Sequence, residues 1–72
     1  MQTPARYEIR VAGVLDVGWS AWFDELEVTS DDQLGQTVIA GPVADQAALH
    51  GVLARIRDLG LTLIAVRRIE PD

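Results

Sequence analysis

The chain has 72 residues, of which 49% are hydrophobic, and its mean hydropathy is slightly positive at +0.14. This composition is typical of a folded globule and excludes a disordered chain. A chain this short buries a smaller fraction of its surface on folding than a longer one, and without cysteine it has no disulfide to compensate. We therefore expect a single domain, ordered from about residue 6 to residue 69, that gains stability by burying surface against a second copy.

Six arginines against eleven acidic residues give a net charge of −5, which disfavours binding to nucleic acid or to anionic lipid. The first residues lack the apolar stretch of a secretory signal, and the longest apolar run, near residues 61–66, is much shorter than a membrane span. We therefore expect a cytoplasmic protein that binds neither nucleic acid nor membranes.

The first predicted strand begins at Tyr7, because apolar and polar residues alternate from there, and it extends to about Leu15. A short helix capped by Asp16 follows. In it Trp19, Trp22 and Phe23 are spaced at i, i+3 and i+4, so the three rings share one face. A helix of about two turns has no independent stability, so these rings must be buried against another element.

The second and third strands form a predicted hairpin. Residues 26–29 alternate between apolar and polar, and residues 30–35 are a polar turn cluster that ends in glycine. The third strand covers residues 37–40. We expect it to end at Gly41 and Pro42, because proline cannot donate a hydrogen bond to a neighbouring strand.

The main helix is predicted to begin after the N-cap Asp45 and to end before Gly60, which suits the left-handed position beyond a helix. Its apolar residues follow helical spacing and are predicted to face the core: Leu49, Val52, Leu53, Ile56 and Leu59. The last strand covers residues 61–69. Its alternation predicts apolar residues on both faces, with Leu63 on one and Val66 on the other.

The order strand, short helix, strand, strand, helix, strand predicts an α+β fold of the ferredoxin-like type, β-α(short)-β-β-α-β. This is a four-stranded antiparallel sheet with both helices on one face and the first and third strands at the centre. The alternative is a β-meander followed by one helix and a strand. Because Val38 and Ile39 point opposite ways and the last strand is apolar on both sides, we expect the open sheet face to be apolar. Such a face is typical of a partner surface, here for a homodimer or for a ligand held between two copies.

The sequence predicts no catalytic residue, metal site or cofactor. The spacing from Gly13 to Ser20 is that of a phosphate-binding loop, but Trp19 replaces its lysine and Asp16 adds negative charge, so we reject it. His50 is the only histidine, and no nucleophile is patterned beside it, which favours a helix-surface residue over a general base. One histidine without cysteine is too little for a metal site.

Three stretches of the sequence together resemble a family: WSAWFD at residues 19–24, GPVADQAALHG at residues 41–51 and RIRDLGL at residues 55–61. They resemble short bacterial proteins known only as hypothetical, uncharacterised proteins. The resemblance covers most of the chain from Tyr7 to Ile69 and implies a small α+β domain that forms a whole protein. It implies no activity and no site residue.

Two hypotheses about function follow. The first is a non-enzymatic, self-associating interaction or regulatory domain, a homodimer in which His50, Arg57 and Asp58 on the main helix face a protein partner. The second is a small dimeric ferredoxin-like barrel that binds or transforms an apolar or aromatic molecule, like cofactor-free oxygenases and isomerases. In that case Trp19, Trp22 and His50 would line a pocket between helix and sheet.

Overall fold

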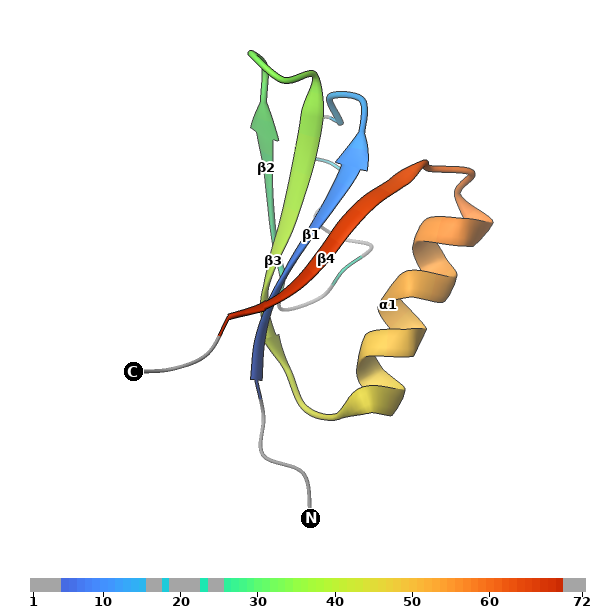
Figure 1. Ribbon diagram of the computed structural model, residues 1–72. Helices are drawn as coiled ribbons and strands as arrows, with labels where there is room; N and C mark the ends of the chain where they lie inside the picture. Colours follow the sequence, from blue (N-terminus) through green and yellow to red (C-terminus); the bar gives the residue numbers. More distant parts are fainter. Residues whose placement is uncertain (1–4, 16–17, 19–22, 24–25, 70–72) are drawn as a thin grey trace.

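The computed structural model describes residues 5–15, 18, 23 and 26–69. Within these residues the elements are β1 (Ala5–Ala12), β2 (Glu27–Asp31), β3 (Gln36–Val43), α1 (Gln46–Asp58) and β4 (Leu63–Ile69). The strands form one four-stranded sheet in the order β2-β3-β1-β4, in which all neighbours are antiparallel, and α1 lies on one side of it (Figure 1). The predicted α+β class with a four-stranded antiparallel sheet is therefore confirmed. Of the predicted short helix only residues 18 and 23 are described, and Asp16, Trp19 and Trp22 lie outside the described residues.

The core lies between α1 and the sheet face that α1 covers. Every second residue of β1 and of β3 is buried there, as expected for strands with one covered face. The buried apolar residues are Tyr7, Ile9, Val11, Phe23, Leu26, Ile39, Val43, Leu49 and Ile56. Because two helix residues and both central strands contribute to it, this core holds α1 in place against β1 and β3.

The two ends of α1 are those predicted from the sequence. The Asp45 side chain accepts a hydrogen bond from the backbone N–H of Ala48 at 2.8 Å, which satisfies a donor that the first turn leaves unpaired. At the other end Gly60 has a φ of 74° and its N–H donates to the carbonyl of Arg57 at 3.0 Å. A residue with a Cβ is strained in this conformation, so glycine is the favoured residue.

Two predicted strand ends are wrong. β1 ends at Ala12 rather than near residue 15, because Gly13 turns the chain with a φ of 94°. β3 continues through Pro42 to Val43 rather than ending before it. Among the described residues β2 pairs with β3 only as far as Ala40, so at Pro42 no described strand pairs with that side of β3, and a proline is tolerated at such a position.

Thr37 fixes the chain where it leaves β1. Its side chain is fully buried, and its Oγ1 donates to the carbonyl of Gly13 at 2.7 Å and accepts from the backbone N–H of Leu15 at 2.9 Å. A single hydroxyl of β3 therefore satisfies two polar groups of the segment that follows β1, as burial of polar groups requires.

The prediction that Leu63 and Val66 face opposite ways is wrong, because β4 contains an irregularity. In the pairing with β1, Val66 lies opposite Ile9 and Leu63 lies opposite Val11, and the register shifts between these pairs. The shift adds one residue, Ile64, to β4, as in a β-bulge. Since Ile9 and Val11 both face the core, Leu63 and Val66 both lie on the side of the sheet where α1 packs.

The prediction that the other sheet face is apolar is also wrong for its central part. Arg10 of β1 lies in the middle of this face, with its Nε 3.0 Å from Oε1 of Glu8. Its Nη1 donates to Oε1 of Gln36 on β3 at 3.2 Å and lies 3.8 Å from Oδ2 of Asp31 on β2. Three strands thus bring polar side chains around one guanidinium, and this surface is suited to water rather than to an apolar partner.

Candidate functional site

The three residues predicted to face a partner lie on the exposed surface of α1. His50, Arg57 and Asp58 are all exposed. Nε and Nη2 of Arg57 are each 3.2 Å from Oδ1 of Asp58, and the two side chains are 77% and 70% exposed. An ion pair this exposed contributes little stability, so the pair does not explain by itself why these residues are here.

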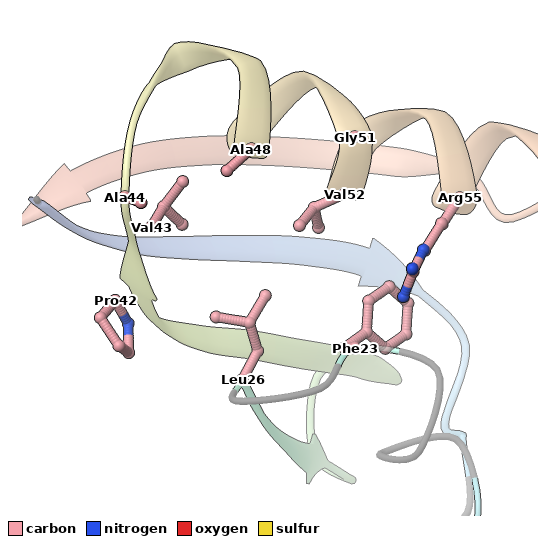
Figure 2. A pocket seen from close by; sticks show the side chains of 9 residues that line it. All are labelled: Phe23, Leu26, Pro42, Val43, Ala44, Ala48, Gly51, Val52 and Arg55. Carbon is pink, nitrogen blue, oxygen red and sulfur yellow. The ribbon is translucent and has the colours of Figure 1, made fainter.

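The structure contains a pocket of about 510 Å³ beside α1 (Figure 2). Three parts of the chain contribute described residues to it: Phe23 and Leu26 before β2, the end of β3 with the residue after it, and one side of α1. The described residues that line it are Phe23, Leu26, Pro42, Val43, Ala44, Ala48, Gly51, Val52 and Arg55. Phe23, Leu26 and Val43 belong to the buried core, so they give the pocket an apolar floor.

His50 is not among the residues that line this pocket. The helix residues that do are 48, 51, 52 and 55, the i, i+3, i+4, i+7 spacing of one helix side. At 100° per residue, His50 lies roughly 150° around the helix axis from the centre of that side. The structure therefore does not bring His50 to the pocket, and Trp19 and Trp22, its predicted companions, lie outside the described residues.

Sequence reasoning missed Arg55 and Gly51 as pocket residues. The available signal was the spacing of small residues along α1, since Ala48 and Gly51 are three apart and Arg55 follows four residues later. These residues give one side of the helix small side chains and a single charged one. The prediction instead followed residue type and selected His50, the only histidine, which lies on the other side of the helix.

Gly51 lies in the interior of α1, and a Cβ built there meets nothing within 4 Å. Gly51→Ala should therefore raise the free energy of unfolding by about 0.5–1 kcal/mol, because alanine is the better helix former. Gly60→Ala is the matched control and should lower it, since Gly60 has a φ of 74°. Urea unfolding of both variants checks the prediction, and a loss of stability in Gly51→Ala would contradict it.

β4 presents the second notable surface. It is the last strand in the order β2-β3-β1-β4, so β1 pairs with one of its edges only. Leu63 and Ile64 are each 46% exposed and Val66 is 39% exposed. Apolar side chains of this size are normally buried more completely when a strand lies inside a folded core. Among the described strands β4 thus combines an edge that no other strand pairs with and apolar side chains in contact with water.

Within residues 5–15, 18, 23 and 26–69, no group of three or more His, Cys, Asp or Glu side chains is arranged to hold a metal ion. In the same residues no helix is long and apolar enough to cross a membrane. The described part of the chain is a small α+β domain with exposed apolar side chains on its edge strand β4 and a pocket beside α1.

The chain belongs to the family described as Domain of unknown function (DUF8691), whose model matches residues 6–67. No curated protein and no solved structure matches the chain. The family match agrees with the resemblance to an uncharacterised family, and it covers all of β2, β3 and α1 and most of β1 and β4. The family description gives no activity, so any function must be argued from the surfaces above.

Proposed function

We propose that this chain is a non-enzymatic, self-associating interaction module in which two copies pair through β4. The observation that carries the proposal is β4 itself, an edge strand whose Leu63, Ile64 and Val66 are 39–46% exposed. Backbone N–H and C=O groups at an open edge pair readily with another strand, and exposed apolar side chains gain free energy when that strand covers them.

The other edge of the sheet does not offer the same opportunity. β2 has only five residues, Glu27–Asp31, and apart from Val28 they are polar or charged. Short and charged edge strands are how natural sheets prevent pairing with other chains. β4 also carries Arg67 and Arg68, but it is longer and its exposed apolar side chains have no counterpart in β2, and this contrast supports β4 as the interface.

A two-fold axis at Val66 gives a register for this pair in which the two β4 strands run antiparallel. In this register Val66 of one copy lies opposite Val66 of the other. The remaining pairs across the two copies are Ala65 with Arg67, Ile64 with Arg68, and Leu63 with Ile69. No arginine then lies directly opposite an arginine, which would be destabilising. Arg67 also keeps its place opposite Glu8 within its own chain. The arrangement is isologous, as in most homodimers.

We also propose that the whole chain has the ferredoxin-like fold. Two observations support it: β1 and β3 are the central strands of the sheet, and α1 connects β3 to β4, which lie on either side of β1. We further assign the exposed side of α1, with His50, Arg57 and Asp58, as the surface for a protein partner. The exposure of these three residues supports this assignment.

Val66→Lys tests the interface. A lysine in the middle of β4 adds a charge that pairing would bury, so the variant should dissociate into monomers. We expect the natural chain to sediment as a dimer at about 100 µM and the dissociation constant of Val66→Lys to be at least about tenfold higher. Equilibrium ultracentrifugation measures both.

Leu34→Lys is the matched control, because Leu34 is 62% exposed and lies in the turn between β2 and β3, away from β4. It should leave the dimer intact. Circular dichroism should show that both variants keep the natural fold. A natural chain that is monomeric at this concentration would overturn the proposal, and so would equal association of the two variants.

A further inference from the structure

The pocket beside α1 has the size and the floor of a small-molecule site. Its volume of about 510 Å³ lies within the usual range of roughly 300–1,000 Å³ for ligand pockets. Phe23 is 2% exposed, Val43 4% and Leu26 8%, so the floor is already desolvated by the core. These three side chains are therefore held in place but expose little surface of their own, so a ligand here would bury mainly the exposed apolar surface of Pro42, Ala44 and Ala48 around them.

Arg55 brings a guanidinium to the described rim of the pocket. Among the described residues that line it, Arg55 is the only charged one, in a chain whose net charge is −5. Its side chain extends from α1 toward the ring of Phe23 at one end of the pocket (Figure 2). A guanidinium has five N–H donors in a planar fork that matches a carboxylate. The Arg55 side chain can therefore bind a ligand carboxylate and still donate to another group of the protein.

Gly51 adds no side chain to the part of the pocket wall that α1 forms. Glycine inside a helix destabilises it by about 1 kcal/mol relative to alanine. The described residues give no packing reason for that cost, because a Cβ at Gly51 would meet nothing within 4 Å. The missing side chain instead leaves space beside Val52, in the wall between the apolar floor and Arg55.

We propose that this pocket binds a small aliphatic monocarboxylate. The alkyl chain lies over the buried floor and packs against Pro42, Ala48 and Val52, and the carboxylate accepts hydrogen bonds from the Arg55 guanidinium. An aliphatic ligand fits a wall made mostly of leucine, valine, proline and alanine side chains. The site is separate from the β4 interface and does not depend on dimer formation.

The test compares three probes that share a chain length and differ in head charge: octanoate, 1-octanol and octylammonium. Each is titrated into the ¹⁵N-labelled protein while amide chemical shifts are recorded. We expect saturable shifts at Ala44, Ala48, Gly51 and Val52. Octanoate should bind at least about tenfold more tightly than 1-octanol, since a charge-assisted hydrogen bond is added, and octylammonium should bind most weakly.

Two variants identify the contacts. Arg55→Gln should reduce the affinity for octanoate to that for 1-octanol, whereas Arg57→Gln, the same change on the other side of α1, should leave it unchanged. Gly51→Leu places a side chain in the pocket and should abolish binding of octanoate and 1-octanol together. Val66→Lys should bind octanoate like the natural chain, which separates this site from the dimer interface.

The absence of shifts at the pocket residues with all three probes would overturn the site. Equal binding of octanoate and 1-octanol, or equal effects of Arg55→Gln and Arg57→Gln, would overturn the role of Arg55. Should Arg55→Gln fail to fold, octanoate binding by Gly51→Leu at the natural affinity would by itself refute the proposed location.

Discussion

Ile56→Ala should lower the free energy of unfolding by about 2–5 kcal/mol, the range for truncating a buried isoleucine. Ile56 is 2% exposed and lies in the core with Leu49, so alanine there leaves a cavity that the sheet beneath it cannot fill. A loss of this size is comparable with the whole stability of a small domain. Urea unfolding followed by circular dichroism, at one fixed protein concentration, measures it.

Leu53→Ala is the matched control on the same helix. The helical spacing makes Leu53 a core position, and on that basis its truncation would cost as much as that of a fully buried residue. In the structure Leu53 is only partly buried against the core. Its truncation should therefore cost roughly half as much, because less apolar surface returns to water. Equal effects of the two substitutions would mean that α1 presents a different side to the sheet.

Thr37→Val should destabilise the protein by about 1–3 kcal/mol, although valine has nearly the same shape and a higher strand propensity. The hydroxyl of Thr37 is fully buried and is bonded to both Gly13 and Leu15. Without it a carbonyl and an N–H lose their partner inside the protein. The amide of Leu15 should also exchange its hydrogen faster, which nuclear magnetic resonance detects.

Thr29→Val gives the comparison for this prediction. Thr29 is exposed on β2, and its hydroxyl reaches the carbonyl of Val38 only at 3.5 Å. Water replaces such a bond, so the change should be within about 0.5 kcal/mol of zero. If both threonine substitutions had the same effect, the two hydrogen bonds of Thr37 would not be what holds the segment after β1.

Local sequence signals predicted the elements of this fold that depend on neighbouring residues. Alternation located β1, the cluster between β2 and β3 located their turn, and Asp45 and Gly60 located the two ends of α1. Each of these signals acts over a few residues, through a cap, a turn or a repeating side-chain direction. This is why they could be identified without any knowledge of the rest of the molecule.

The features that were missed depend on residues far apart in the sequence. The extra residue in β4 exists only in relation to its pairing with Arg10 and Val11, so alternation along β4 alone gave the wrong faces. The polar centre of the open sheet face requires Asp31 and Gln36 to meet Arg10 from two other strands. No local pattern contains that information.

The candidate site was predicted least well for the same reason. The pocket combines Phe23, Val43 and Arg55, which come from three separate parts of the chain. The sequence directed attention to His50 through its residue type, whereas the walls of the pocket are made by ordinary apolar residues whose importance lies only in their position.

The difference between the two sheet edges has a consequence for assembly size. In the proposed dimer the β4 edges of the two copies pair with each other through a two-fold axis, so neither is open to a third copy. Further growth would need the opposite edge of each sheet. That edge is β2, with Glu27 and Asp31 at its ends. In the proposed dimer these edges would face outward, and their short length and acidic ends would disfavour growth into fibres.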